Sequence, residues 1–247
     1  MSDAADPIFA EPRLAAVHDH LDPDRSDLDA YERLVVDELR ATTALDVGCG
    51  TGELAIRLAR RGVRVVGVDP AGASIDVARA KPGADAVTWV VGTAPDAPAI
   101  QVDVATMTAN VAQVLVDDDA WLETLRAIRA RLRDGGVLSF ETRRPHVRAW
   151  EGWTRDATHQ VVDVPVVGEV EDWVEVTRVD GELVTFESPT VFRADGARYE
   201  STSTLRFRPL SAIVRDLERA GFAVREVRDA PDRPGREWVV VAEALAR

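Results

Sequence analysis

The stretch LDVGCGTG at residues 45–52 decides the fold of this 247-residue chain. An apolar run leads into glycines at every second position, which are Gly48, Gly50 and Gly52, and a helical pattern follows. Glycine adopts the backbone angles of such a strand-to-helix turn without strain, and its missing side chain lets a ligand lie against bare main chain. A second apolar run then ends in Asp69. Strand, glycine turn, helix, strand and terminal acid together predict half of a nucleotide-binding α/β fold.

The spacing of the glycines indicates which nucleotide is bound. Dinucleotide sites carry G-x-G-x-x-G, whereas this chain carries G-x-G-x-G, so the third glycine comes one position early. This argues against a nicotinamide-dependent dehydrogenase, which stays as an alternative. Asp69 stands where its carboxylate can accept two hydrogen bonds from the vicinal hydroxyls of a ribose.

The segments LDVGCGTGELAIRLA at 45–59 and VVGVDPAGASIDVARAK at 65–81 closely resemble the class I S-adenosylmethionine-dependent methyltransferases. Three later segments continue the likeness in the order and spacing of that family, at 89–94, 107–113 and 133–138. The resemblance implies S-adenosyl-L-methionine as cofactor. It also implies a Rossmann-like, doubly wound, mostly parallel seven-stranded sheet, here with an antiparallel β insert as a cap.

The resemblance further implies a role for each matching position. Main chain at Gly48 and Gly50 would contact the amino-acid end of the cofactor, which Asp46 would support, and Asp69 would bind the ribose hydroxyls. Many relatives carry Asp at the position of Thr93, whose hydroxyl is a weaker acceptor for the adenine amino group. The other positions expected around the cofactor are Cys49, Pro70 beside the adenine, Ala94 at the adenine edge, and Thr108 and Asn110 in the loop after the fourth strand.

Hydrophobic periodicity and turn residues predict the other elements. Strands are expected at 43–47, 63–68, 87–91, 102–107, 137–142, 222–228 and 237–244, and helices at 52–61, 72–80, 117–132 and 209–221. Three parts follow from this pattern: a helical lead-in at 1–40, a methyltransferase core at 41–145 and 209–247, and a β cap insert at 146–208.

The cap insert is predicted from a change in sequence pattern. No helical period runs through 161–208, and Asp-Gly pairs at 180–181 and 195–196 separate β-rich runs. Asp-Gly between such runs favours a hairpin, because both turn residues need positive φ. We therefore expect one antiparallel meander, with strands near 170–179, 182–193 and 197–208. It leaves the carboxyl edge of the parallel strands and should roof the site.

Methyl transfer from a sulfonium is an in-line displacement that needs no enzyme nucleophile, and a general base helps when the acceptor must lose a proton. His18 is the first candidate for that base, with a surface helix histidine as the alternative. His146 follows the fifth core strand and is the second candidate. The sequence leaves transfer to N and transfer to O equally open. A non-catalytic protein that binds S-adenosylmethionine or S-adenosylhomocysteine remains a further alternative.

Two tryptophans and an arginine are candidates for contact with the acceptor. Trp150 and Trp153 stand between the fifth core strand and the cap, where they could line an apolar acceptor pocket or pack the cap on the core. Arg143 follows the same strand, and it could pair with an acidic acceptor or form a salt bridge within the protein.

Composition limits the remaining functions. The formal net charge of −13 opposes binding to phosphate backbones and acidic lipids, so we expect a small-molecule acceptor, no nucleic acid and no membrane. An apolar content of 46% fits a globular core. The single cysteine excludes an internal disulfide and favours a cytoplasmic protein. No Cys/His spacing suggests a metal, and the sequence leaves the oligomeric state open.

Overall fold

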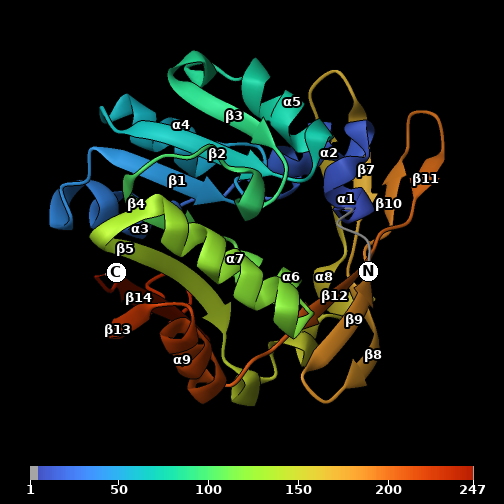
Figure 1. The fold of residues 1–247 in the computed structure, drawn as a ribbon. Helices are drawn as coiled ribbons and strands as arrows, with labels where there is room; N and C mark the ends of the chain where they lie inside the picture. The colour runs from blue at the N-terminus through green and yellow to red at the C-terminus, as the bar shows by residue number, and fades with distance from the viewer. Residues whose placement is uncertain (1–4, 247) are drawn as a thin grey trace.

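Seven strands form the central sheet of the computed structural model, which describes residues 5–246 (Figure 1). They are β1 (Thr43–Val47), β2 (Arg64–Asp69), β3 (Val87–Val91), β4 (Val102–Met107), β5 (Leu132–Arg143), β13 (Phe222–Asp229) and β14 (Glu237–Ala244). Their order is β13-β14-β5-β4-β1-β2-β3. All pairs among β1 to β5 are parallel, and β14 is antiparallel to both β5 and β13. The predicted fold class is confirmed.

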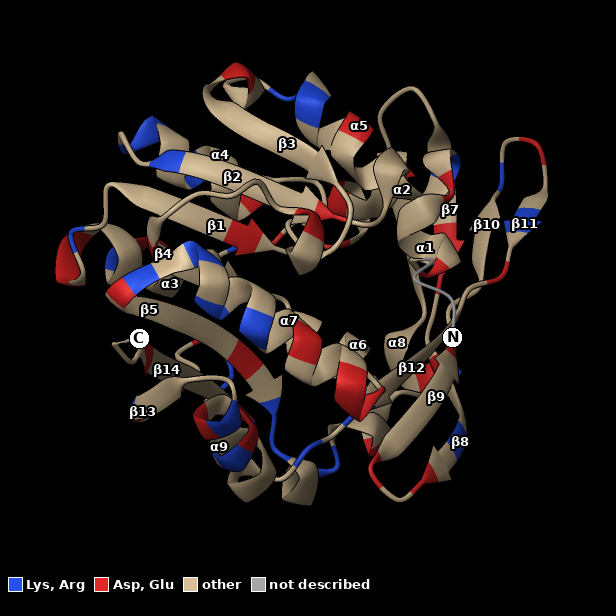
Figure 2. Ribbon diagram, in the orientation of Figure 1, with Lys and Arg blue, Asp and Glu red and all other residues tan. Residues whose placement is uncertain are grey.

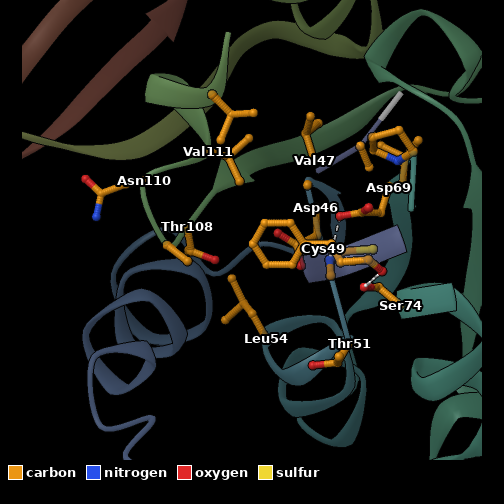
Figure 3. A pocket seen from close by; sticks show the side chains of 18 of the residues that line it. Asp46, Val47, Cys49, Thr51, Leu54, Asp69, Ser74, Thr108, Asn110 and Val111 are labelled. Atoms are coloured by element: carbon orange, nitrogen blue, oxygen red, sulfur yellow. Dashed lines mark hydrogen bonds between the residues drawn. The ribbon is translucent and has the colours of Figure 1, made fainter. Parts of the chain in front are cut away.

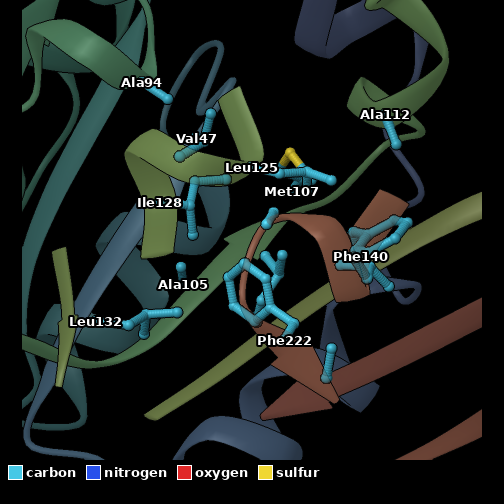
Figure 4. Packing of buried hydrophobic residues seen from close by; sticks show 14 of the residues in the cluster. Val47, Ala94, Ala105, Met107, Ala112, Leu125, Ile128, Leu132, Phe140 and Phe222 are labelled. Carbon is cyan, nitrogen blue, oxygen red and sulfur yellow. The ribbon is translucent and has the colours of Figure 1, made fainter. Parts of the chain in front are cut away.

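Helices cover both faces of this sheet. They are α3 (Leu28–Arg33), a π-helix (Leu34–Glu38), α4 (Glu53–Arg60), α5 (Gly72–Ala80), α6 (Val111–Val114), α7 (Asp118–Arg131) and α9 (Leu210–Arg219), with short 3₁₀ turns at Ala84–Ala86 and Ala94–Asp96. Successive strand residues face opposite ways, so Val104 packs in the cluster under α3 and α4 while Ala105 packs in the cluster under α7 and α9. Figure 4 shows Leu125 and Ile128 of α7 above this second cluster.

The predicted core elements agree closely with these bounds, and the main difference lies in β5. This strand begins at Leu132 rather than at 137, because Leu132 already pairs with Val102. Between that pair and the pair Val104–Val137 the register shifts, and Gly135 takes φ +74° there. Gly135 and Gly136, which stand just before the predicted start of the strand, therefore lie at an irregularity inside it.

The cap contains two sheets instead of one meander. Its strands are β6 (Gln160–Val164), β7 (Gly168–Asp172), β8 (Glu175–Asp180), β9 (Leu183–Glu187), β10 (Thr190–Phe192), β11 (Ala197–Tyr199) and β12 (Thr202–Arg206). The sheets are β11-β10-β7-β6 and β12-β9-β8. The prediction of a single three-stranded meander was therefore wrong.

The physical reason is that each predicted strand crosses from one sheet to the other. The run expected at 170–179 divides between β7 and β8, the run at 182–193 between β9 and β10, and the run at 197–208 between β11 and β12. Pro189 stands at the second break and has no N–H to donate to a ladder. Both Asp-Gly hairpins are confirmed, because β8 pairs with β9 and β10 with β11 in antiparallel fashion.

Two N-terminal helices, α1 (Pro7–Ala10) and α2 (Pro12–Leu21), lie beside the cap in Figure 1. Leu14 and Val17 of α2 pack in one apolar cluster with residues of the β6–β7–β10 sheet. Ser74 Oγ of α5 donates to the carbonyl of Phe9 (2.9 Å), and the amide of Ile8 donates to Ser201 Oγ of the cap (3.1 Å). The N-terminal helices are thereby attached to both the core and the cap.

Between β5 and β6 the chain forms short helical turns that the sequence did not predict, at Pro145–Val147, Ala149–Gly152 and α8 (Arg155–Thr158). Among residues 5–246, no helix is both long and apolar enough to cross a bilayer.

Candidate cofactor and acceptor site

A cavity of about 380 Å³ lies where the chain leaves the carboxyl ends of β1, β2, β3 and β4. This volume is within the usual range of small-molecule sites. Its walls come from the loops after these strands and from the N-terminal helices. β1 lies between β2 and β4, so the cavity stands at the switch point where ligands bind in open α/β sheets.

The three glycines after β1 all take left-handed backbone angles, with φ +71° at Gly48, +52° at Gly50 and +81° at Gly52. A Cβ on Gly48 would meet Val111 at 2.5 Å, and one on Gly52 would meet Trp89 at 2.4 Å. A Cβ on Gly50 would meet no protein atom within 4 Å. Packing therefore requires glycine at the first and third positions, whereas Gly50 presents bare main chain to open space in the cavity wall.

Asp69 at the end of β2 is bonded to the glycine loop. Its Oδ2 accepts from the amide of Gly50 and its Oδ1 from the amide of Ala71, each at 2.8 Å. The side chain is nearly buried, and burial raises its pKa against the effect of these two bonds. A carboxylate offers about four lone pairs, so two remain for a ligand in the cavity. Figure 3 shows Asp69 and Cys49 close together, with Asn110 toward the opposite end of the pocket.

Asp46 on β1 places a second carboxyl in the cavity wall. Its Oδ1 accepts from Thr106 Oγ1 at 2.7 Å, and the residue is only 1% exposed. Burial raises its pKa to about 7. Acidic residues mark the tip of β1 and the first turn of α7 in Figure 2. A cationic ligand in the cavity would favour the charged form of Asp46.

Thr93 and Ala94 line the cavity after β3, together with Pro70 after β2. Thr93 Oγ1 donates to Asp96 Oδ2 at 3.0 Å, and the Thr93 amide donates to the same oxygen at 2.8 Å. A hydroxyl has a single proton, so the bond to Asp96 leaves the Thr93 oxygen to act as an acceptor. The sequence analysis missed Asp96, although an acid three residues after a threonine is the signal of a capping box.

His18 and Asn110 line the cavity away from the adenine side, together with Thr108. His18 Nδ1 is buried without a hydrogen-bond partner among the described residues and lies 3.9 Å from Asp19 Oδ1. Asn110 takes φ +61°, and its Nδ2 donates to Glu237 Oε2 at 3.3 Å. The Oδ1 of Asn110 likewise has no partner within the described chain. These two atoms are the unsatisfied polar groups that a ligand would complete.

The structure brings Arg143 to the cavity wall. Its Nη1 donates to Gln113 Oε1 at 3.0 Å, and its guanidinium lies 5.3 Å from the ring centre of Trp153. Trp150 and Trp153 are not among the residues that line the cavity. Both rings pack on Phe207, with centroids 4.5 Å and 6.1 Å away. In this structure the two tryptophans pack within the cap, in one apolar cluster with Val184, Leu205 and Phe207.

His146 is also outside the lining of the cavity. It is exposed, and its ring lies 6.3 Å from that of Trp238. The 3₁₀ turn after β5 (Pro145–Val147) carries it there. Of the two histidines expected near the acceptor, the structure brings only His18 to the cavity.

Several lining residues were missed by sequence reasoning. They are Asp6, Phe9, Asp22, Arg25, Asp27, Ser74 and Arg233. Most come from the N-terminal lead-in, where no local pattern indicates that these helices dock over the glycine loop. Within the described chain, no group of three or more His, Cys, Asp or Glu side chains could hold a metal ion.

Comparison with known proteins identifies the domain. A family model described as a methyltransferase domain matches residues 44–136. Over 108 residues the chain is 33% identical to the cypemycin N-terminal methyltransferase of Streptomyces sp., a match that covers 43% of this chain and 44% of the relative. The chain spans about half the length of the curated relatives it matches.

Two solved structures share the fold over almost the whole chain. A methyltransferase of Streptomyces caelestis superposes with a TM-score of 0.74 at 21% identity, covering 100% of both chains. A sugar N-methyltransferase of Streptoalloteichus sp. superposes with a TM-score of 0.73 at 21% identity, covering 90% of this chain and 88% of that one. At this identity the likeness shows the fold.

Residues 44–136 therefore match a methyltransferase domain, and solved methyltransferase structures share the fold over most of the chain. The resemblance in the sequence implies S-adenosyl-L-methionine as the cofactor of such a domain. The cavity fits this cofactor. Gly50 leaves main chain bare, Asp69 retains free lone pairs, and two carboxyl groups favour a cation.

Proposed function

We propose that the protein transfers a methyl group from S-adenosyl-L-methionine to a nitrogen or oxygen of a small-molecule acceptor. One observation carries this proposal. The bare main chain at Gly50 and the Asp69 carboxylate form one hydrogen-bonded unit in a cavity that also reaches His18, whose Nδ1 makes no hydrogen bond in the described chain and lies 3.9 Å from Asp19 Oδ1. The cavity thus joins groups suited to the cofactor with a titratable group suited to an acceptor.

The proposal gives the cofactor-binding residues expected from the sequence the following roles. Asp69 would hold the ribose hydroxyls, Thr93 would accept from the adenine amino group, and main chain at Gly48 and Gly50 would contact the amino-acid end, near Asp46. The cofactor, when bound, supplies a methyl group that is already activated by the positive charge on sulfur. The protein then mainly fixes the reacting atoms in line and excludes water.

His18 would take the proton that an acceptor loses. Its Nδ1 has no hydrogen-bond partner in the described chain, so an acceptor N–H or O–H would meet an unoccupied base. Phe9 lies against the His18 ring, with centroids 5.5 Å apart, and also lines the cavity. The N-terminal helices would therefore hold the base and close the cavity to water on this side.

A small molecule fits the charge of the protein better than a polyanion does. The net charge of −13 repels nucleic acid at long range. Among the solved structures with this fold is one named as a sugar N-methyltransferase, which supports a metabolite as acceptor. Cofactor binding without turnover is the second candidate, favoured by the position of His146, Trp150 and Trp153 outside the cavity.

The test combines binding with transfer. S-adenosylhomocysteine at a hundredfold excess over its Kd should raise the free energy of unfolding by about 2.7 kcal/mol in a thermal melt. Transfer of a radiolabelled methyl group is then followed over a panel of small amines and matched alcohols. A melt unaffected by S-adenosylhomocysteine would reject the proposal. Binding without transfer to any acceptor would favour the second candidate.

A further inference from the structure

A second cavity, of about 290 Å³, lies between α2 and the β6–β7–β10 sheet of the cap. Its lining contains no residue of the glycine loop. It adjoins the cofactor cavity, because His18 and Asp22 line both cavities. Its complete lining is Ile8, Leu14, His18, Leu21, Asp22, Gln160, Asp172 and Thr190. None of the cofactor contacts proposed above involves the cap residues of this cavity, which are Gln160, Asp172 and Thr190.

The polar side of this cavity holds two carboxyl groups, from Asp22 and Asp172, together with His18, Gln160 and Thr190. Asp172 Oδ1 is buried and has no hydrogen-bond partner in the described chain. Burial raises the pKa of Asp172 to about 6, against the opposing effects of Gln160 and His159. Buried carboxylate oxygens are rarely left unpaired in native structures, so this one calls for a donor from outside the chain.

The charge balance defines that donor. Asp22, which is exposed, places a second carboxyl at the rim, where the two cavities meet. Among the described residues that line the second cavity, none is lysine or arginine. Two carboxyl groups in a lining without lysine or arginine favour a cation, and an ammonium carries three N–H donors with which to satisfy them.

The remaining walls are aliphatic. Leu14 is buried, and Ile8 and Leu21 are half-buried beside it. A ligand here would therefore have a short apolar body as well as a charged group. His18 and Asp22 line both this cavity and the cofactor cavity, so the two cavities adjoin at these residues.

We propose that this second cavity binds an ammonium group of the acceptor, with Asp172 and Asp22 as its partners and the aliphatic walls around its carbon body. The inference rests on the proposed function and narrows the acceptor to an aliphatic amine. The inference assigns Asp172 to acceptor binding and not to cofactor binding.

The test uses isobutylammonium chloride as a probe and isobutanol as its uncharged control. Each is titrated into the protein saturated with S-adenosylhomocysteine, and binding is followed by the NMR amide shifts of Leu14, His18 and Asp172. We expect saturable binding of the ammonium alone, centred on these residues. Asp172→Asn should weaken it by roughly tenfold to a hundredfold, since one charged hydrogen bond is lost.

Matched variants keep the result specific. Asp163→Asn on β6 makes the same charge change at an exposed position of the same sheet and should leave the probe affinity unchanged. Asp22→Asn is a second variant at an exposed site, so it measures the effect even if Asp172→Asn folds poorly. Equal binding of isobutanol, wild-type affinity in both Asp172→Asn and Asp22→Asn, or no saturable ammonium binding would each overturn the inference.

The same experiment separates this inference from the proposed function. Calorimetry gives the affinity for S-adenosylhomocysteine before the probe is added, and Asp172→Asn should not change it. Loss of S-adenosylhomocysteine binding in the wild-type protein would refute the cofactor assignment. Normal S-adenosylhomocysteine binding without an ammonium site would refute only the second cavity as the place of the amine.

Discussion

The amide of Gly50 donates a 2.8 Å hydrogen bond to Oδ2 of Asp69, which lies 19 residues farther along the chain. This bond makes the glycine loop after β1 and the acid at the end of β2 one structural unit. The two most specific features of the sequence therefore act together. The acid both shapes the loop and, in our proposal, binds the ribose.

The first prediction concerns this acid. Asp69→Ala removes a charged acceptor for two ribose hydroxyls and also releases Gly50, so it should weaken S-adenosylhomocysteine binding by about 2–4 kcal/mol. Calorimetry measures the change. Asp85→Asn, at an exposed position before β3, is the control for charge and should bind normally. An unchanged affinity in Asp69→Ala would remove this residue from the site.

The second prediction separates the two glycines that line the cavity. Gly48→Ala strains a left-handed backbone and brings Cβ to within 2.5 Å of Val111, so it should lower the free energy of unfolding by about 2–4 kcal/mol. The added Cβ of Gly50→Ala meets no protein atom within 4 Å. This variant should therefore lower the free energy of unfolding by only about 1–2 kcal/mol, from backbone strain.

In cofactor binding, Gly50→Ala should have a larger effect than Gly48→Ala. The reason is that the new methyl group of Gly50→Ala occupies open space in the cavity wall. Urea unfolding and calorimetry on the same samples give both quantities. The interpretation of Gly50 fails if its alanine variant is folded and binds S-adenosylhomocysteine as tightly as wild type.

The third prediction is a pH dependence from Asp46. Burial raises the pKa of this carboxyl from 3.8 to about 7, so between these values the native state holds a proton that the unfolded chain has lost. Its contribution to stability therefore falls as the pH rises through that window. Asp46→Asn should flatten this fall, which is measured as the difference between two unfolding series over the same pH values.

Cofactor affinity should change in the opposite direction. The ionised form of Asp46 favours the ammonium of the cofactor, so S-adenosylhomocysteine should bind more tightly as the pH rises through about 7. Asp46→Asn should remove most of this dependence. A variant with the full wild-type pH profile would show that another group titrates.

The fourth prediction tests the packing of Trp150 within the cap. Trp150 is 9% exposed and packs edge-on against Phe207, so Trp150→Ala should lower the free energy of unfolding by about 3–5 kcal/mol. Affinity for S-adenosylhomocysteine should remain that of wild type in the folded fraction. Trp150→Phe keeps an aromatic ring and should recover much of the stability. A stable Trp150→Ala protein would contradict the packing role.

The central sheet was predictable because local patterns and local turns determine it. The strands at 43–47, 87–91 and 102–107 are short apolar runs bounded by turn residues, and the glycine loop after the first of them has φ values that other residues rarely adopt. The cofactor side of the cavity follows from these same turns. Every predicted cofactor residue lies in its lining.

The cap and the acceptor side depend on contacts that leave little local trace. Pro189 marks one of the points where a strand crosses between sheets, but nothing comparable marks the breaks after Asp172 and Tyr199. His146 is turned away by a 3₁₀ segment without a strong sequence signal. The docking of α1 joins Ile8 to Ser201 across 193 residues, a distance no periodicity can reveal.

The contact between Ile8 and Ser201 also determines when this part of the structure can form during synthesis of the chain. The helices α1 and α2 are synthesised before their partners Ser74 and Ser201, which belong to the core and to the end of the cap. A contact of such long sequence separation forms late, because loop closure must precede it. A nascent chain that already has its glycine loop thus still lacks one wall of the cavity until Ser201 has been synthesised.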